Sequence, residues 1–329
     1  MNTAPRARVA RRPVHGVLLL DKPLGWSSND VLQKAKWLLR AEKAGHTGTL
    51  DPLATGVLPL CFGAATKFSQ VQLDADKTYQ ATLVLGRTTS TGDAEGQTVC
   101  ERPVRVCAEQ VQQVAQRFLG SVAQTPPMYS ALKHQGRPLY AYARAGQTVE
   151  RAARTVTIYA LNLTLTQSEY AQATIEMIVT CSKGTYVRTL AEDIGEALGC
   201  GAHLSRLRRL DTGGLNIADA LTLDAWTELT DTQRVARLLP VAVLLRGHTA
   251  VTLDDANAAR FLSGLRRRGH WADTPTAAVY ALDGTLLGSA RIQGGELIPV
   301  RLLSAIEIQQ IKSQNMGLAV EHASTPTTP

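Results

Sequence analysis

The sequence predicts an α+β fold, because stretches with the periodicity of strands are widely separated in the chain and helical stretches lie between them. Apolar and polar residues alternate over 78–86, 155–166 and 173–181, which predicts three strands. The apolar run 16–20 predicts a buried strand near the beginning. These features indicate a mixed sheet with inserted helices.

Apolar residues at helical spacing predict the helices. After the turn 21–25, Ser27 or Ser28 can cap a helix that ends near Glu42. Residues 108–119 and the stretch after Arg188 repeat the helical spacing. Beyond Pro240, residues 253–265 predict a helix, and short strands follow over 277–284, 285–292 and 297–303, with Asp283-Gly284 as a turn.

Length and composition favour a chain of two domains that binds a polyanion. The chain has 329 residues, which exceeds one typical domain, and a net charge of +7. Five cysteines without a CxxC pair predict reduced thiols in a cytoplasmic protein. No apolar run approaches the roughly 18 residues that a membrane span requires, so we expect no membrane contact.

Both ends of the chain read as disordered. Residues 1–14 carry four arginines and no acid, which predicts a disordered basic arm that can touch phosphates. A transit peptide is the alternative, since a secretory signal would need a longer apolar core. The Ser/Thr/Pro-rich residues 315–329 predict a disordered tail.

One stretch of the sequence contains a candidate catalytic residue. Residues 45–67, GHTGTLDPLATGVLPLCFGAATK, surround a single acid, Asp51, with glycines and apolar residues. A carboxylate in such surroundings suggests a chemical role, because burial and close partners would set its pKa. The alternative is that Asp51 caps a helix whose first residue is Pro52.

Five segments in order resemble the tRNA pseudouridine-55 synthase (TruB) family. They are GVLLLDKPLGWSS at 16–28, GHTGTLDPLATGVLPLCFGAATKFSQ from 45, LGRTTSTGDAEG at 85–96, PPMYSALKHQGRPLYAYARAG at 126–146 and CSKGTYVRTLAEDIGEALGCGAHLSRLRR at 181–209. The resemblance implies a pseudouridine synthase catalytic domain over 15–240 with a mixed, largely antiparallel sheet. It also implies a thumb insertion over about 124–152 and, from a weaker match, a small PUA-like RNA-binding β-barrel over 247–313.

The resemblance assigns three catalytic residues, each of which has a plainer alternative. Asp51 matches the essential carboxylate. Arg188 matches the arginine placed against it, although an arginine at the end of a strand is usually a surface ion pair. Tyr79 matches the ring that packs on the flipped uracil near C5, whereas a strand tyrosine is more often core packing.

Four further positions match residues that bind the substrate. They are His46, which would stack within the T-loop, Tyr186 beside Arg188, Leu207, which would pad the uracil, and Lys22 in the opening turn. The alternatives are a surface loop histidine, a core leucine at helical spacing and a solvated turn lysine. Asp93 lies in an acidic turn and reads as a supporting or RNA-facing residue.

Two basic stretches are candidates for gripping RNA. The thumb interleaves basic residues with Tyr129, Tyr140 and Tyr142, which suits phosphates and bases. Its alternative is a surface loop pinned by prolines. The cluster 265–270, LRRRGH, could contact the backbone of an acceptor stem or form a solvated face.

The implied reaction breaks the N1–C1′ bond of uridine, rotates the base and rejoins it through C5. It needs no cofactor, and the sequence has neither a phosphate-binding GxxxxGK[ST] motif nor zinc-ligand spacing. Asp51 could attack C1′, attack C6 or remove a ribose proton. We expect a monomer that acts on the T-arm of tRNA; the alternatives are a synthase for another RNA and a tRNA-folding chaperone or binding module.

Overall fold

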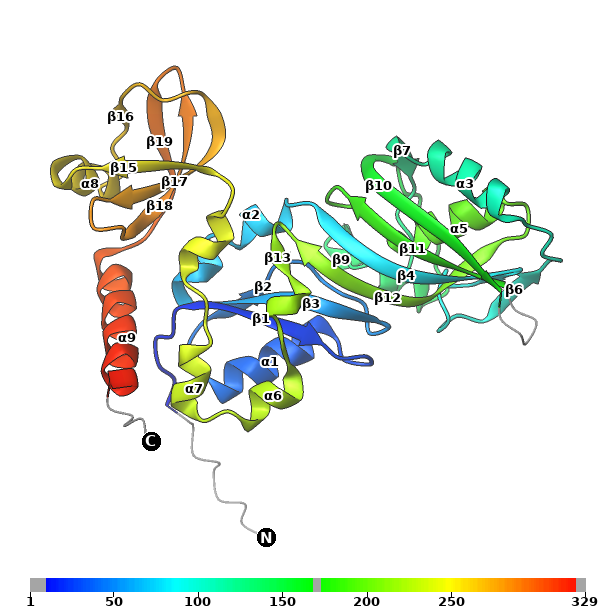
Figure 1. Ribbon diagram of the computed structural model, residues 1–329, viewed down its shortest axis with the longest axis horizontal. Coiled ribbons are helices and arrows are strands. Elements are labelled where there is room, and N and C mark those ends of the chain that lie inside the picture. Colours follow the sequence, from blue (N-terminus) through cyan, green and yellow to red (C-terminus); the bar gives the residue numbers. More distant parts are fainter. Residues whose placement is uncertain (1–9, 168–172, 324–329) are drawn as a thin grey trace, which may run out of the picture. The chain divides into compact units, whose positions relative to one another are not determined.

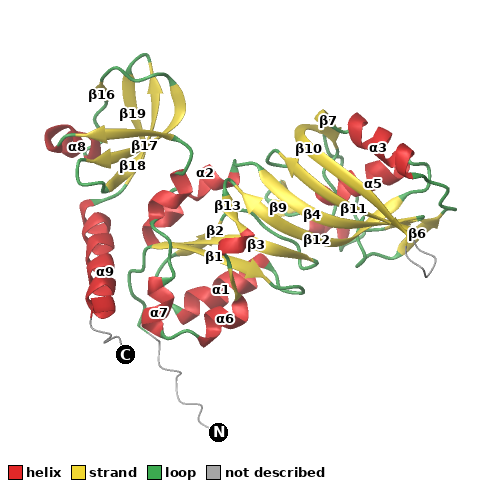
Figure 2. Cartoon of the chain, in the orientation of Figure 1, coloured by secondary structure: helices red, strands yellow, loops and turns green. Residues whose placement is uncertain are grey.

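The computed structural model describes residues 10–167 and 173–323, without the side chains of 167 and 318–323. The chain divides into two compact units. The first consists of residues 1–51, 58–73 and 218–329, and the second consists of residues 52–57 and 74–217. Strand β3 (Ala54–Phe62) belongs partly to each unit, and the chain enters the second unit directly after Asp51. Figures 1 and 2 show the elements of both units.

The first unit begins with strand β1 (Gly16–Lys22), which confirms the predicted buried strand. Strand β14 (Leu221–Thr222) pairs with it in parallel. Strand β2 (Ala44–His46) lies antiparallel to the second half of β3, with His46 opposite Leu60. Short helices complete this part of the unit: η1 (Gly63–Lys67), α2 (Ser69–Leu73), α6 (Leu223–Glu228), α7 (Asp231–Ala236) and η3 (Val241–Leu245), while η2 (Ile217–Asp219) begins at the last residue of the second unit.

Helix α1 (Ser28–Leu38) has the predicted capping residue and buried face. Ser27 is the N-cap, and its hydroxyl accepts a hydrogen bond from the backbone N–H of Asp30. Val31, Leu32 and Ala35 are buried. The helix ends at Leu38, somewhat before the predicted end near Glu42. Figure 1 shows α1 and α6 beside strand β1.

The C-terminal part of the first unit holds a five-stranded sheet in the order β15-β17-β18-β19-β16. The predicted helix and three strands are present as α8 (Asp255–Leu262), β17 (Thr274–Ala281), β18 (Leu286–Gln293) and β19 (Glu296–Leu302). Strands β15 (Thr249–Leu253) and β16 (Arg267–Arg268) were not predicted. Gly284, with φ +79°, forms the predicted turn between β17 and β18.

The termini are more ordered than the sequence predicts. Part of the predicted arm is held in place, since the backbone of Arg12 bonds to Arg40 and Glu42 and Val14 is buried, whereas Ala10, Arg11 and Pro13 are exposed. Residues 1–9 lie outside the described residues. Helix α9 (Ala305–Ala323) continues through 315–323, where disorder was predicted, and residues 324–329 lie outside the description.

Contacts made early in α9 explain why this helix forms. Lys67 Nζ pairs with Glu307 at 2.5 Å and donates to Leu302 O at 2.9 Å. His15 Nδ1 accepts from the Ala64 N–H, so its Nε2–H donates to Gln310 Oε1 at 3.0 Å. These tertiary partners are not visible in the low-complexity composition of the tail.

The second unit is built on a sheet in the order β3-β12-β4-β11-β10-β7, in which only β3 and β12 are parallel neighbours. Strands β4 (Lys77–Leu85), β10 (Arg154–Gln167) and β11 (Ala173–Cys181) confirm the three predicted alternating strands. Strand β12 (Ala202–Thr212) was not predicted, because leucines three residues apart in SRLRRL resemble a helix. The unit also contains β5 (Arg87–Thr89), β6 (Thr98–Glu101), β7 (Gly120–Gln124), β13 (Leu215–Asn216) and two short strands of the thumb.

Helices α3 (Ala108–Arg117) and α5 (Val187–Ala197) cover one face of this sheet (Figure 1). The predicted inner residues Val111, Val114 and Ala115 of α3 are buried. Tyr159 and Ile178 are exposed on the strands of the same sheet. All five cysteines are free thiols. Among the described residues, no helix is both long and apolar enough to cross a membrane.

Candidate active site

Strand β12 supports one half of the predicted site in the second unit. Leu207 lies opposite Ala54 of β3 on one side and Ala81 of β4 on the other. Arg209 lies opposite Gly56 and Tyr79 in the same way. The alternative that Leu207 is a core leucine of a helix is therefore wrong, because it is a half-buried residue of a strand. The register places Tyr79, which is buried, two strands away from the segment that follows Asp51.

The glycine-rich segment after Asp51 is shaped by its close approach to β12. Gly56 has φ +108°, and a Cβ there would lie 2.2 Å from Arg209 O and 2.5 Å from Arg209 N. Arg209 is itself almost fully buried, and its Nε donates to Val57 O at 2.8 Å. Only a glycine allows the two backbones to approach this closely.

Asp51 does not cap a helix. Residues 52 and 53 form a turn and strand β3 begins at Ala54, so the capping alternative is wrong. The residue before Asp51 is clamped by Ser28, whose hydroxyl donates to Leu50 O at 3.0 Å and accepts from Leu50 N at 2.8 Å. Both groups are buried, so helix α1 fixes the path of the backbone that presents Asp51.

Lys22 and His46 belong to the same unit as Asp51. Lys22 is 0% exposed, which rules out the solvated alternative. Its Nζ donates to Trp26 O at 2.6 Å and to Pro23 O at 2.9 Å, so the ammonium holds the opening turn closed. His46 is the last residue of β2 and is half-buried, so it is not a loop histidine.

Arg188 is buried in the second unit with an acidic partner. It is 6% exposed, so the surface ion pair is wrong as an alternative. Its Nη1 lies 3.4 Å from Asp93 Oδ2 and donates to Thr91 O at 3.1 Å, and its Nη2 donates to Tyr129 O at 2.6 Å. Asp93, which the sequence left as a supporting residue, is thus a direct partner of Arg188.

The turn that carries Asp93 is attached to strand β12. The Ala94 N–H donates to Leu204 O at 2.9 Å, and the Leu204 N–H donates to Gly92 O at 3.0 Å. The Glu95 N–H donates to Asp93 Oδ1 at 3.1 Å. The turn that holds the Arg188 guanidinium is therefore fixed to strand β12. The same strand carries Leu207 and pairs with the strand of Tyr79.

Sequence reasoning missed Glu192, which lies one turn after Arg188 on α5. A Cβ on Gly92 would lie 2.8 Å from its carboxyl group, so the glycine leaves room for this acid beside the Asp93 turn. Burial raises the pKa of Glu192 to about 7, and the charges of Asp193 and Asp93 act in the same direction while Arg188 opposes them. The i, i+4 spacing from Arg188 was the one signal in the sequence.

Tyr186 joins the thumb to helix α5. It is the N-cap of α5, its N–H donates to Gln124 Oε1 at 3.0 Å, and Gln124 Nε2 donates back to its carbonyl at 3.4 Å. Gln124 is buried at the start of the thumb. One limb of the thumb is therefore fixed by Tyr186 and by the bond from Arg188 to Tyr129 O.

The rest of the thumb is a small, largely exposed structure. It contains the hairpin of β8 (Lys133–His134) and β9 (Arg137–Pro138), followed by helix α4 (Leu139–Ala143). The Arg137 guanidinium lies 4.8 Å from the Tyr142 ring centroid, and that of Arg144 lies 5.4 Å from the Tyr140 centroid. The predicted interleaving of cations and rings is thus present in space.

Comparisons with known proteins agree in sequence and in fold. The TruB family pseudouridylate synthase N-terminal domain matches residues 36–187, and the tRNA pseudouridylate synthase B C-terminal domain matches residues 188–246. The tRNA pseudouridine synthase B of Verminephrobacter eiseniae is 62% identical over 315 residues, which cover 94% of this chain and 95% of the relative. That of Ralstonia pickettii is 57% identical over 303 residues, which cover 89% and 95%.

Solved structures show the same fold. A chain of a Cbf5–Nop10–Gar1 complex superposes with a TM-score of 0.66 and 26% identity, over 88% of this chain and 84% of that one. A chain of an H/ACA RNP bound to a substrate RNA containing 2′-deoxyuridine gives the same TM-score at 24% identity, over 89% and 86%. The architecture is the α+β pseudouridine synthase fold. The chain belongs to the TruB family of pseudouridylate synthases.

Proposed function

We propose that this enzyme converts the T-loop uridine at position 55 of tRNA to pseudouridine. The observation that carries the proposal is Asp51, a carboxylate in a glycine-rich segment whose backbone is clamped by the buried Ser28 hydroxyl. The near-complete match to enzymes named tRNA pseudouridine synthase B supports tRNA as the substrate. The reaction conserves atoms: the N1–C1′ bond breaks, a C5–C1′ bond forms, C5 loses a proton and N1 gains one.

We assign the essential role to Asp51, with Arg188 as its electrostatic partner and Tyr79 as the wall against the uracil. Attack at C1′, attack at C6 and removal of a ribose proton all require the ionised carboxylate. A guanidinium can bind both oxygens of a carboxylate and favour that form in a dry site. Arg188 is suited to this, because its burial and its fixed acceptors hold the guanidinium in one orientation. Tyr79 would lie near C5, where the proton leaves.

The other assigned residues would bind and position the RNA. Lys22 holds the opening turn, His46 stacks within the T-loop, Leu207 pads the uracil, and Tyr186 supports the base of the thumb. The target base must leave its stack, which costs a few kcal/mol, and contacts made by the thumb would offset that cost. Remote contacts should therefore change the rate as well as the affinity.

We also propose the domain roles that the resemblance implies. Residues 15–240 would form the catalytic domain with a mobile thumb over 124–152. Residues 247–313 would form a PUA-like RNA-binding barrel, to which the five-stranded sheet would belong. The enzyme would act as a monomer in the cytoplasm and without a cofactor.

The test is release of tritium from unmodified tRNA labelled at uracil C5. Wild-type enzyme should release about one tritium per tRNA, because C5 loses its hydrogen in this isomerisation. Asp51→Asn keeps the shape of the side chain but removes its charge, so it should abolish release while tRNA affinity stays nearly intact. A tRNA without the T-loop target uridine should also give no release with the wild-type enzyme.

Other results of the tritium-release test would contradict different parts of the proposal. Release from Asp51→Asn would overturn the assignment of the carboxylate. Release that does not depend on the T-loop uridine would keep the chemistry but change the substrate position, and release from ribosomal RNA alone would change the substrate. Tight tRNA binding without any release would indicate a chaperone or binding module.

A further inference from the structure

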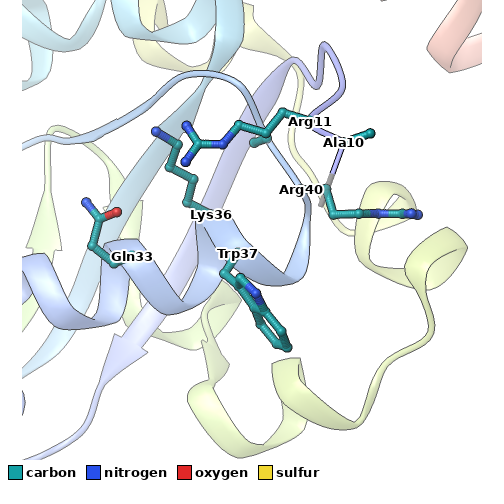
Figure 3. A pocket seen from close by; sticks show the side chains of 7 residues that line it. Ala10, Arg11, Gln33, Lys36, Trp37 and Arg40 are labelled. Atoms are coloured by element: carbon teal, nitrogen blue, oxygen red, sulfur yellow. The ribbon is translucent and has the colours of Figure 1, made fainter. Parts of the chain in front are cut away.

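A surface hollow of about 880 Å³ lies at the C-terminal end of helix α1 (Figure 3). The segment 10–12 forms one wall, because the backbone of Arg12 bonds to Arg40 and Glu42, and its Nε donates to Leu39 O at 3.1 Å. The end of α1 and the residues after it form the other wall. The residues that line this Trp37 hollow are Ala10, Arg11, Gln33, Lys36, Trp37, Arg40 and Ala41.

The aromatic group of the hollow is open to solvent. Trp37 is 64% exposed, although α1 buries Val31, Leu32 and Ala35 on another face. The indole therefore contributes little to the core of the unit. Lys34 Nζ lies 5.6 Å from the centroid of its ring, so a cation already accompanies the exposed indole. A large aromatic surface left in water beside cations is suited to an external partner.

Two cations of the hollow lack acidic partners. Among the described residues, neither Arg11 nor Lys36 lies within ion-pair distance of an acid. Arg40 differs, because its guanidinium is bound by Asp231 of helix α7. Lys36 can interact with the negative end of the α1 dipole, but Arg11 comes from a separate segment and has no such role. In Figure 3 the Arg11 and Lys36 side chains extend together, and the Trp37 ring projects in another direction.

We infer that the Trp37 hollow binds an unpaired RNA strand, with phosphates on Arg11 and Lys36 and a base stacked on the Trp37 indole. Cations for the backbone combined with an aromatic face for a base are the recognition elements of single-stranded nucleic acid. A protein partner would be expected to supply carboxylates and apolar side chains, but the hollow offers only one apolar ring. Stacking on one ring favours RNA without selecting its sequence.

This site is distinct from the catalytic loop. Ser28, at the other end of α1, holds Leu50 directly before Asp51. Trp37 follows about nine residues later, which is about 14 Å along the axis of a helix. The strand bound here would therefore lie outside the position of the reacting uridine, and it would add affinity without taking part in the chemistry.

The test uses the full-length protein and a short fluorescein-labelled oligoadenylate, which contains no uracil and so cannot be a substrate. Binding is measured by fluorescence anisotropy at several salt concentrations. Trp37→Ala should weaken binding about 5- to 150-fold, the range expected for loss of one stacked base. Trp37→Phe keeps an aromatic face and should retain most of the affinity. The double variant Arg11→Ala, Lys36→Ala should reduce the slope of log affinity against log salt by about 1.4.

The matched control is Tyr159→Ala, which removes a ring that is 55% exposed but has Asp76 as its charged neighbour. This control should bind oligoadenylate as the wild type does. Inorganic polyphosphate, which has charge but no base, should bind Trp37→Ala and the wild type equally. Unchanged oligoadenylate binding by Trp37→Ala, or an equal loss of polyphosphate binding, would overturn the inference. Tritium release from tRNA, measured on the same preparations, tests the role of Asp51 separately.

Discussion

Arg188 shows how one side chain is fixed by several distant segments. Its acceptors come from the acidic turn, through Asp93 and Thr91, and from the thumb, through Tyr129. Each charge of the buried pair would be costly if it were left alone, so each holds the other in place. The guanidinium is therefore held in one orientation, which is the property that the role proposed for Arg188 requires.

Glu192 should make the stability of the protein depend on pH in a direction opposite to that of most carboxylates. Its pKa rises from 4.5 to about 7 on folding, so between these values the unfolded chain loses a proton that the folded protein keeps. The free energy of unfolding then falls as pH rises through this window, and the penalty is complete above about pH 7. Because the side chain is only half-buried, we expect an effect of about 1–2 kcal/mol.

The measurement is urea unfolding of wild type and Glu192→Gln between pH 5 and pH 8. The free energy of unfolding of the variant should rise relative to that of the wild type as pH rises, because the variant carries no charge next to Asp93 and Asp193. Glu196→Gln on the same helix is the control, since a hydrogen bond from Arg102 lowers the pKa of Glu196 and the group stays ionised in both states across this window. If the free energies of unfolding of Glu192→Gln and wild type differed by the same amount at every pH, the charge on Glu192 would not destabilise the folded protein.

For individual residues, the sequence was enough to identify candidates but not to predict their surroundings in the fold. Asp51, Tyr79 and Arg188 were identified through a resemblance, and the plainer alternatives weighed for Lys22 and Arg188 placed both side chains at the surface. Both are buried: Lys22 donates to carbonyl groups of its own turn, and Arg188 donates to carbonyl groups of the acidic turn and the thumb, which are distant in sequence. Glu192 was missed since its pKa is raised mainly by burial, with a further contribution from the nearby charge of Asp93, and both depend on how the chain folds. The partners of Arg188 and the surroundings of Glu192 follow from tertiary structure and not from local pattern.

Among the elements, the close pairing of β3 with β12 depends on one glycine. Gly56→Ala would place a methyl group 2.2 Å from Arg209 O, and the residue would also keep a positive φ. Backbone atoms in a sheet cannot move away easily, so we expect a loss of stability of about 2–4 kcal/mol and lower activity at the adjoining Asp51 loop. Thermal unfolding and tritium release measure the two effects.

Gly136→Ala separates backbone strain from steric overlap. Gly136 has φ +80°, but a Cβ there meets nothing within 4 Å. This variant should lose only about 1 kcal/mol, the cost of a strained backbone in an open turn. Equal losses at both positions would show that the approach of Arg209 to Gly56 has no energetic consequence.

Elements with regular periodicity were predictable, and those that depend on tertiary contacts were not. The alternating strands β4, β10 and β11 and the capped helix α1 follow from local pattern. Strand β12 was missed because its buried residues do not alternate with exposed ones; residues 202–204, for example, are buried in succession. The end of helix α9 over 315–323 was predicted as disordered, since the bonds from Lys67 and His15 that hold the start of the helix come from segments far away in the sequence.

For the whole molecule, the location of uncompensated charge matters more than the net charge of +7. The basic cluster 265–270 is partly neutralised, because Arg266 and Arg268 both pair with Glu296 at 3.2 Å. In the thumb, Lys133, Arg137 and Arg144 have no acidic partner among the described residues. Cations without acidic partners attract phosphates more strongly, so the thumb should contribute more of the electrostatic attraction to RNA.

The salt dependence of tRNA binding tests this difference. Replacing Lys133, Arg137 and Arg144 with alanine should reduce the slope of log affinity against log salt by about 2–3, which corresponds to three lost phosphate contacts. The comparison variant replaces Arg266 and Arg268 with alanine and Glu296 with glutamine, so that no unpaired acid remains, and it should reduce the slope by about 1 or less. If the second variant reduced the slope as much as the first, Glu296 would not shield its arginines, and the C-terminal sheet would bind the phosphate backbone as strongly as the thumb does.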